Sequence, residues 1–412
     1  CSSLEMAISR LKLISAHDSL TIMRNAISAP KLNYNLRTSP CAGHENLQKF
    51  DGLLRKALCT IANVDVTDRQ WEQASLPINS GGLGIRSVSA LAPSAFLASA
   101  AETRATQDLI LSSVSVTAEA DNEVVRIKEI WGNYSKTQFP NYIVGTQLQK
   151  RLDHLCTTAI KTRIQEELMG TGLTRFLAVS APHAGDWLKC IPVSSCGLRL
   201  DDEAVRVAIG LRLGTKICEP HPCVCGEAID ASGSHFLSCK RGSGRVARHN
   251  ALNDVLWRAL QRANIPSVKE PPGLIHTDMK RPDGITQIPW SEGKCITWDV
   301  TVTDTLAAFN LLPSSTVGGG AAEAAARRKE DKYLQLRQHY HFVPVAFETL
   351  GPVNASGAQF IDDIGRRLRA VTDDSRESSF LWQRLSVTLQ RYNAICFRDT
   401  FACESLLDTE TL

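Results

Sequence analysis

The sequence has no long uncharged apolar stretch, no secretory signal and almost no net charge. No run approaches the roughly 18 apolar residues of a membrane-spanning helix, and the opening CSSLEMAISRLK lacks the basic and apolar regions of a signal peptide. We therefore expect an intracellular protein with no membrane partner. The 46 basic and 43 acidic residues leave a net charge of only +3, so local clusters must indicate any nucleic-acid partner.

The composition is that of an ordinary folded protein, with 43% hydrophobic and 22% charged residues and no sign of disorder. A chain of 412 residues exceeds one typical domain and predicts two or three hydrophobic cores. It begins with Cys1 rather than Met, which suggests that it is cut from a longer chain whose upstream part could hold the main activity.

Hydrophobic periodicity predicts a helical first half followed by a mixed second half, and therefore an α+β fold class. Alternating β-branched residues predict strands in GKCITWDVTV and HFVPVAFETLG. The segment MGTGL and the segment 179–198 are expected to separate helices. The expected helices cover 3–28, 46–62, 88–103, 120–131, 146–169, 202–212, 244–264, 320–338, 356–371 and 376–396.

Two short motifs resemble known sites but are better explained as structure. The glycines of LPINSGGLGIRS follow no buried strand and precede no G-K-[ST], so a phosphate-binding loop is not expected. FIDD, from Phe360 to Asp363, resembles a polymerase box, but its apolar residues continue at helical spacing through Leu368. We interpret it as the start of an amphipathic helix.

Four of the 13 cysteines, together with two histidines, lie within 22 residues, whereas the other nine are scattered. Cys223 and Cys225 form a C-x-C pair, and His235 and Cys239 stand at i and i+4, where a helix would place them on one face. Because structural zinc takes four Cys or His ligands in a tetrahedron, these four residues predict a zinc knuckle.

Two alternatives remain for this cluster. Cys218 and His221 could replace a ligand if both residues of the short C-x-C pair cannot bind the same ion. The cysteines could instead be redox-inert residues beside a turn, although buried cysteines rarely occur in such polar, glycine-containing sequence.

Two acids further along predict a second metal site. Asp283 in RPDG and Asp299 in the strand ITWDVTV are separated by enough residues for a strand, a turn and a returning strand. PD-(D/E)xK nucleases place two carboxylates on such a hairpin to hold Mg²⁺. The structural alternatives are turn chemistry for Asp-Gly and a capping or edge role for the strand Asp.

The lysine of that motif is missing, because Thr301 stands two residues after Asp299. A replacement is expected from AEAAARRKEDKY, where Lys329, Lys332 and Tyr333 share one helical face. The alternative is a solvated lysine face without a catalytic role.

Basic residues gather next to this acid pair, as phosphate contacts would require. A solvated surface is the alternative reading. The expected nucleic-acid-binding residues are Arg245, Arg248, His249, Lys280 and Arg281, with Lys240 and Arg241 beside them.

In this order, the C-x-C…H-x3-C cluster, ARHN, RPDG, the strand with Asp299, and KEDKY resemble the C-terminal part of non-LTR retrotransposon proteins that carry a restriction-enzyme-like endonuclease. ISAPKLNYNLRTSPC and LPINSGGLGIRSVSALAPSAFLAS resemble the thumb region of their reverse transcriptases. The resemblance covers essentially the whole chain and is strongest over 205–350. No [FY]-x-D-D hairpin precedes the thumb-like region, so polymerase activity is not expected from this chain.

The resemblance implies a domain order of thumb-like region (1–112), helical linker (113–205), zinc knuckle (206–243) and PD-(D/E)xK-like endonuclease (244–400). It implies structural Zn²⁺ on Cys223, Cys225, His235 and Cys239. Mg²⁺ is expected on Asp283 and Asp299, with Glu270 a further candidate ligand. Lys329, Lys332 and Tyr333 match the family's K-x-x-K-Y element. The implied activity is nicking of target DNA in the nucleus, with element RNA as a second partner. The alternatives are a nucleic-acid-binding fragment with an inert nuclease and an inactive transposon product.

Overall fold

The computed structural model describes residues 2–110, 119–140, 146–274 and 281–401. The chain forms two compact units, Cys1–Leu168 and Met169–Leu412, so the predicted boundary at 112 falls inside the first unit. Helices and small sheets are both present, which confirms the mixed α+β class. Among the described residues, no helix is both long and apolar enough to span a membrane.

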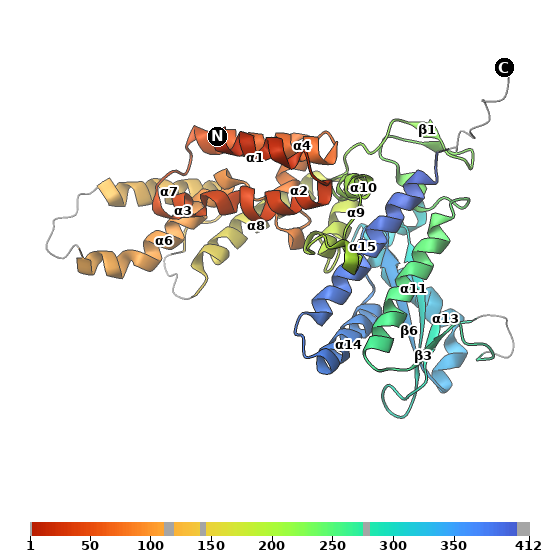
Figure 1. Cartoon of the computed structure of the whole chain (residues 1–412). Coiled ribbons are helices and arrows are strands. Elements are labelled where there is room, and N and C mark those ends of the chain that lie inside the picture. The colour runs from red at the N-terminus through yellow and green to blue at the C-terminus, as the bar shows by residue number, and fades with distance from the viewer. Residues whose placement is uncertain (1, 111–118, 141–145, 275–280, 402–412) are drawn as a thin grey trace, which may run out of the picture. The chain divides into compact units, whose positions relative to one another are not determined.

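The first unit is helical throughout its described residues (Figure 1). The predicted stretch 3–28 is divided, because the side chain of Ser15 caps a new helix by accepting from the backbone N–H of Asp18. The cap is therefore Ser15 and not Asp18. The elements are α1 (Ser2–Leu11), α2 (Ala16–Ile22), the π-turn η1 (Met23–Ile27), α3 (Ala29–Thr38), α4 (Glu45–Ala62), α5 (Asp68–Ala74), the 3-10 turn η2 (Ile78–Ser80), α6 (Val88–Ile110), α7 (Glu119–Ser135) and α8 (Leu148–Glu167).

The glycine-rich loop of this unit joins α5 to α6 and is tightly packed. A Cβ on Gly82 would lie 2.0 Å from the carbonyl oxygen of Leu76, so only glycine fits there. The N-terminus of α6 is occupied by the carboxylate of Asp51, which accepts from the backbone N–H of Val88 at 2.8 Å. This carboxylate stands where a phosphate would bind, in agreement with the interpretation of the glycines as structure.

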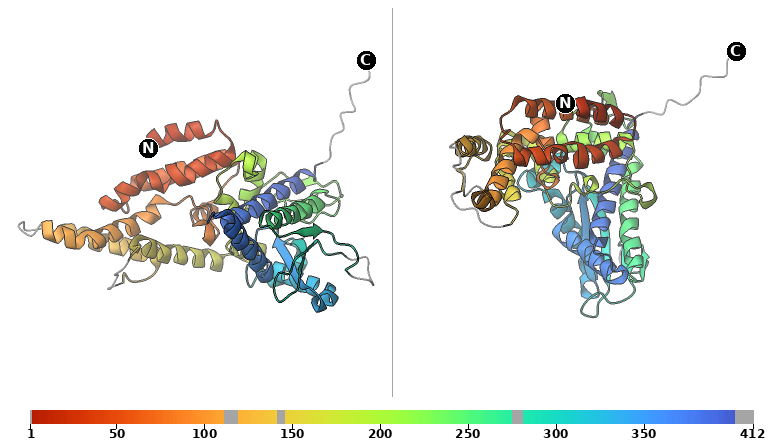
Figure 2. Two further views of the ribbon diagram at one scale, coloured as in Figure 1. Left: turned by 60° about the horizontal axis from the view of Figure 1, so that its bottom comes forward. Right: turned by 60° about the vertical axis from the view of Figure 1, so that its left-hand side comes forward.

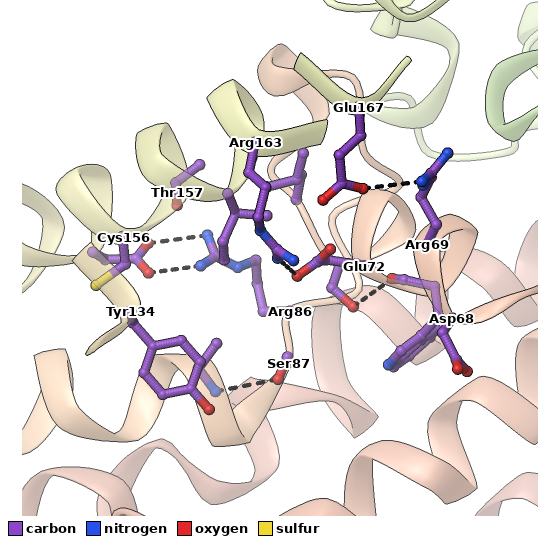
Figure 3. Close-up of a pocket in the computed structure, with 16 residues that line it drawn as sticks. Asp68, Arg69, Glu72, Arg86, Ser87, Tyr134, Cys156, Thr157, Arg163 and Glu167 are labelled. Atoms are coloured by element: carbon purple, nitrogen blue, oxygen red, sulfur yellow. Dashed lines mark hydrogen bonds and ion pairs between the residues drawn. The ribbon is translucent and has the colours of Figure 1, made fainter. Parts of the chain in front are cut away.

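A cavity of about 570 Å³ lies in the first unit, lined by residues of α5, α6, α7 and α8 (Figure 3). Its walls are partly apolar and carry several ion pairs, among them that between Arg86 and Asp153.

The second unit combines helices with two sheets (Figures 1 and 2). Its helices are α9 (Gly170–Val179), η3 (Asp186–Leu188), η4 (Ser194–Cys196), α10 (Asp202–Leu213), η5 (Ser234–Leu237), α11 (Gly244–Arg262), η6 (Ala308–Asn310), α12 (Leu311–Ser314), α13 (Gly320–Lys332), η7 (Leu334–Gln338), α14 (Ala355–Thr372) and α15 (Glu377–Arg398). Its strands are β1 (His221–Pro222), β2 (Ala228–Ile229), β3 (Ser267–Lys269), β4 (Gly284–Thr286), β5 (Ile296–Thr303) and β6 (His341–Glu348).

Of two predictions from the sequence that fall in this unit, one is wrong and the other agrees with the structure. MGTGL does not separate helices but begins α9, whose buried residues Thr174, Phe176 and Val179 outweigh the low helix propensity of its glycines. FIDD lies in α14 as predicted, with Phe360 and Ile364 buried on one face.

The larger sheet has the order β3-β4-β5-β6, in which only the β5–β6 pair is parallel. Its main core lies on one face, where Trp298 and Val300 of β5 pack with α11, α14 and α15. In both views of Figure 2, α11 and α15 run side by side. The other face is covered by α13, whose Ala322, Ala325 and Ala326 pack on Ala346. Because side chains alternate along a strand, Asp299 points toward the α13 face.

Candidate active site and metal centre

The Cys/His cluster predicted from the sequence is assembled in the structure. Cys223 Sγ lies 3.6 Å from Cys239 Sγ, and Cys225 Sγ lies 3.2 Å from His235 Nε2. All four ligand atoms lie within 4.8 Å of one another, and among the described residues no other group of three such ligands was found. Tetrahedral zinc at ~2.3 Å from each sulfur separates its ligands by roughly 3.5–3.8 Å. The donor set therefore fits a metal ion such as zinc.

The local structure differs in part from the prediction. The β1–β2 hairpin presents Cys223 and Cys225 in its turn, where Gly226 adopts a φ of +94°. The sequence predicted that His235 and Cys239 share one face of an α-helix. In the structure His235 lies in the short 3-10 turn η5 and Cys239 lies beyond its end, so this part of the prediction is wrong. Their ligand atoms nevertheless lie within 4.8 Å of each other.

The two substitute ligands lie outside the cluster. His221 Nδ1 lies 2.9 Å from the carbonyl oxygen of Glu219, and its Nε2 lies 3.1 Å from Thr400 Oγ1. Both ring nitrogens are thus engaged elsewhere. Cys218 packs against the cluster, but its thiol donates to the carbonyl oxygen of Asp230.

The thiols of the cluster are unequal in acidity. Burial raises the pKa of Cys223 to about 11, with further increases from its hydrogen bonds to Cys225 and Cys239. Burial acts in the same direction on Cys239, but hydrogen bonds from the backbone of Arg241 and Gly242 and from the side chains of Cys223 and His235 together lower the pKa of that thiol to about 7. A cation in the cluster would stabilise all of its thiolates.

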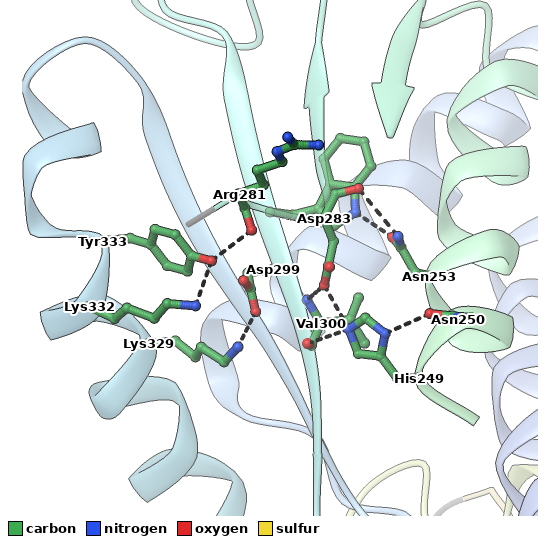
Figure 4. A network of polar contacts seen from close by, with 11 residues as sticks. His249, Asn250, Asn253, Arg281, Asp283, Asp299, Val300, Lys329, Lys332 and Tyr333 are labelled. Carbon is green, nitrogen blue, oxygen red and sulfur yellow. Dashed lines mark hydrogen bonds and ion pairs between the residues drawn. The ribbon is translucent and has the colours of Figure 1, made fainter. Parts of the chain in front are cut away.

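The acid pair meets at the end of the β4–β5 ladder (Figure 4). Gly284 pairs with Trp298, so the same antiparallel register sets the preceding Asp283 across from Asp299. Gly284 opens strand β4, and a Cβ on it would lie 2.0 Å from the Trp298 ring. The absence of a side chain on Gly284 leaves room for the Trp298 ring over the strand. Gly284 is therefore a strand residue, and the alternative that Asp-Gly forms a turn does not apply.

Three groups around Asp299 come from or follow helix α13. Lys329 Nζ lies 2.5 Å from Asp299 Oδ2, and Asp299 is 3% exposed. The hydroxyl of Tyr333 donates to the carbonyl oxygen of Arg281 at 2.8 Å, and Lys332 Nζ donates to that hydroxyl at 2.9 Å. Asp299 and Tyr333 also interact through their side chains. The predicted K-x-x-K-Y residues therefore converge on the hairpin.

Asp283 is held by a histidine that the sequence analysis assigned to phosphate binding. His249 Nε2 lies 3.0 Å from Asp283 Oδ2 and 3.0 Å from the carbonyl oxygen of Val300. The N–H of Val300 donates to the same Oδ2 at 2.6 Å. Because β4 begins at Gly284, none of its residues pairs with Val300, and the side chains of Asp283 and His249 bond to the backbone N–H and carbonyl oxygen of Val300 instead. His249, which was expected on the nucleic-acid surface, thus contacts the acid pair, and its side chain is 32% exposed.

Each acid of the pair contacts its own basic side chain, Lys329 for Asp299 and His249 for Asp283, while the two carboxylates repel each other. Burial, then the charge of Asp283, raises the pKa of Asp299, and the ammonium of Lys329 only partly opposes them. The hydrogen bond to Asp283 raises the pKa of His249 to about 9, although burial opposes this shift. Burial also raises the pKa of Tyr333, which stays a phenol.

The predicted basic surface is only partly available. Arg248 of α11 is 2% exposed and donates to the carbonyl oxygen of Leu237 in η5 and to Asn393 Oδ1 in α15, so it joins these elements and is not available to phosphate. Arg245 and Arg281 are exposed, as the prediction requires. Lys280 lies outside the described residues. Position 248 stands four residues before Leu252 and eight before Leu256, so helical spacing places it on the buried face of α11, although arginine is usually a surface residue.

No relative of this chain emerged from two comparisons. No protein-family model matches it, and no curated protein is significantly similar.

Asn253, one helical turn after His249, is a further residue of this site that was not predicted from the sequence. Its amide donates to the carbonyl oxygen of Asp283 and accepts from the indole of Trp298 at 2.8 Å. The i, i+4 spacing of His249 and Asn253 on α11 was the available signal. Glu270, the further candidate ligand for Mg²⁺, contacts the acid pair through its backbone, because its N–H donates to the carbonyl oxygen of Asp283. Its side chain is exposed.

Proposed function

We propose that this chain is the endonuclease-bearing part of a non-LTR retrotransposon reverse transcriptase, and that it nicks target DNA with Mg²⁺ in the nucleus. The nick would serve target-primed reverse transcription of element RNA. One observation carries the proposal: Asp283 and Asp299 meet across adjacent strands, next to Lys329, in a nearly buried site. Acids so placed are costly to a fold unless they hold a cation.

The two carboxylates suit a divalent cation for a physical reason. Asp299 is destabilised in its charged form by burial and by Asp283, and a cation between the two acids would relieve both effects. Magnesium prefers carboxylate oxygens and keeps part of its water shell. Such an ion, when bound, neutralises phosphate charge and makes water more acidic.

The residues of the chain have separate tasks in this proposal. Asp283 and Asp299 would hold the ion, and His249 and the N–H of Val300 fix the orientation of the Asp283 carboxylate through its Oδ2. The ammonium of Lys329 offsets the negative charge that develops on the phosphate when water attacks. Breaking the bond between phosphorus and O3′ leaves a 3′ hydroxyl on the nicked strand.

The Cys/His cluster has a structural task in this proposal. Zinc on Cys223, Cys225, His235 and Cys239 would hold the hairpin β1–β2 against the start of α11, the helix that carries His249. Arg245, exposed in the first turn of α11, is then available for a DNA phosphate.

The test is a nicking assay on supercoiled plasmid with Mg²⁺ or EDTA, comparing the chain with Asp283→Ala. Relaxation that requires both Mg²⁺ and Asp283 is the expected result. DNA binding without relaxation under any divalent ion would favour the second candidate, a nucleic-acid-binding fragment whose nuclease is inert. The contact of Lys329 with Asp299 favours the nuclease, because a binding surface has no need of a lysine directed inward.

A further inference from the structure

Strand β5 directs the backbone groups of alternate residues toward its two edges. The carbonyl oxygens of Cys295, just before the strand, and of Thr303 accept from the N–H groups at the start of β6 and just beyond its end. The odd-numbered residues therefore face β6, and the even-numbered residues face the opposite edge.

This opposite edge is only partly occupied. Trp298 pairs there with β4, and the side chains of Asp283 and His249 bond there to the backbone of Val300. Val302 is the next residue that faces this edge. Within the described residues, the structure shows no hydrogen bond to the N–H or the carbonyl oxygen of Val302, and the residue is partly exposed. Its N–H is therefore available to water or to a ligand.

Helix α11 runs along the same edge of β5, in the opposite direction (Figure 4). The indole of Trp298 donates to Asn253, and the carbonyl oxygen of Val300 contacts His249. Four residues of a helix rise about 6 Å, and two residues of a strand rise about 6.6 Å. One further turn back along α11 therefore brings Arg245 level with the unbonded backbone of the strand.

The charges at this level favour an anion. The exposed guanidinium of Arg245 donates to the carbonyl oxygen of Ser238 at 3.3 Å, and within the described part of the chain it forms no ion pair. The acid two residues beyond the unbonded backbone, Asp304, is 8% exposed. Its Oδ1 accepts from the N–H of Leu306 and the hydroxyl of Thr349, so this carboxylate is engaged inside the fold. A backbone N–H and a guanidinium together match the oxygens of a phosphate.

A peptide strand is the other occupant that an open sheet edge could take. Strand addition needs several consecutive open positions, because its affinity comes from repeated main-chain hydrogen bonds. Here side chains already occupy the edge at Val300, and β5 ends at Thr303. One free position beside an arginine fits a single phosphate better than a peptide.

We propose that the N–H of Val302 and the guanidinium of Arg245 bind the DNA phosphate next to the one that is cut. This inference rests on the proposed function and adds a second phosphate site to it. Val302 stands two residues, about 6.6 Å, beyond Val300, a step similar to that between neighbouring phosphates of one strand. The cut strand therefore lies along this edge of β5 and is held there by its backbone and not by a base.

The first test uses the wild-type chain alone. Its nicks are mapped to single nucleotides, and the same duplex is then made with one neutral methylphosphonate at either phosphate that neighbours the nick. We expect one of the two replacements to slow nicking about tenfold, the effect of one hydrogen bond to a charged group. Equal rates on both modified duplexes and on the unmodified duplex would overturn the proposal.

Two variants at position 302 assign the contact to the backbone. Val302→Pro removes the N–H, and proline is tolerated where a strand N–H faces an open edge. This variant should nick the unmodified duplex more slowly and respond less than wild type to the neutral phosphate. Val302→Ala keeps the N–H and should respond to the neutral phosphate as wild type does. An undiminished response in Val302→Pro would contradict the assignment.

The arginine is tested by DNA binding, which does not require nicking. Arg245→Met should reduce the slope of log affinity against log salt by about 0.9, the contribution of one phosphate contact. Arg258→Met, on the same helix, is the control, because that guanidinium pairs with Asp254. An unchanged slope in Arg245→Met would overturn the proposal.

These measurements separate this inference from the proposed nuclease. Nicking that is indifferent to both neighbouring phosphates and to Arg245→Met defeats this inference alone. DNA binding with the expected change of slope, but without any nicking, defeats the nuclease and leaves the phosphate site. The comparison of duplexes needs no variant, so it holds even if Val302→Pro disturbs the fold.

Discussion

Lys329 Nζ lies 2.5 Å from Asp299 Oδ2, and the two groups come from a helix and a strand that face each other across one side of the sheet. The alanines at 322, 325 and 326 make this approach possible, because small side chains let α13 lie close to β5 and β6. The lysine therefore reaches the acid pair from a helix, although the strand position two after Asp299 is Thr301.

The first prediction concerns this lysine. Lys329→Met keeps the length of the side chain and removes the charge, so we expect Mg²⁺-dependent nicking to fall about 100-fold. Arg328→Met, an exposed position on the same helix, is the matched control and should keep most of the activity. Equal rates for the two variants would remove Lys329 from the reaction.

The second prediction concerns His249, which positions Asp283 without contacting the proposed ion. Partners that orient metal ligands change metal affinity by about 10-fold to 100-fold when removed. His249→Ala should therefore shift the Mg²⁺ concentration for half-maximal nicking upward by that factor. High Mg²⁺ should restore much of the rate. A lower rate at every Mg²⁺ concentration, with no shift in the midpoint, would assign His249 a different role.

The third prediction concerns the cysteine cluster. The purified chain should contain about one zinc ion, and Cys225→Ser should lose it and unfold at a lower temperature, because bound metal stabilises the fold. His221→Ala should retain the metal, since both ring nitrogens of His221 are engaged outside the cluster. Elemental analysis and thermal unfolding measure both effects. Metal loss in His221→Ala and retention in Cys225→Ser would show that the ligand set is wrong.

The fourth prediction concerns Glu348, a fully buried acid that accepts from the backbone N–H of Ala322 at the start of α13. Burial raises its pKa, so its contribution to stability is present below the ordinary glutamate pKa of about 4.3 and is lost as pH rises through the folded-state value. Glu348→Gln keeps the acceptor and cannot ionise.

We therefore expect the free energy of unfolding of Glu348→Gln, relative to wild type, to increase from pH 4 to pH 8. Urea unfolding at the two pH values measures it, and Glu330→Gln, on the surface of α13, is the control. A difference that does not change with pH would contradict the raised pKa.

Local patterns predicted much of this structure. The helix expected over 46–62 is Glu45–Ala62, and the strand around Asp299 is Ile296–Thr303, because each has a clear hydrophobic period. The Cys/His cluster could be found because its ligands are close in sequence. Helical spacing predicted that Lys329, Lys332 and Tyr333 lie on one face of a helix. It could not predict that this face lies against the acid pair.

Long-range contacts were the part that the sequence could not provide. His249 and Asp283 are far apart in sequence. No local pattern indicates that both bond to the backbone of Val300, where β5 has no partner residue in β4. Arg248 carries the signal of a surface residue, yet its guanidinium is buried because Asn393 and the backbone of Leu237 accept its hydrogen bonds. Helix α9 was not predicted, because two glycines in its first turn lower the helix propensity. The burial of one of its faces, which stabilises the helix, depends on tertiary packing that the sequence does not show.

The most direct test of the central claim is plasmid nicking by Asp299→Asn, with DNA binding and zinc content measured on the same samples. Asparagine keeps the shape of the buried side chain and removes the charge that would hold the divalent ion. We predict that Mg²⁺-dependent nicking disappears while DNA affinity and zinc content stay close to the wild-type values. Undiminished nicking by this variant would contradict the assignment of the Asp283 and Asp299 pair as the metal site of a nuclease.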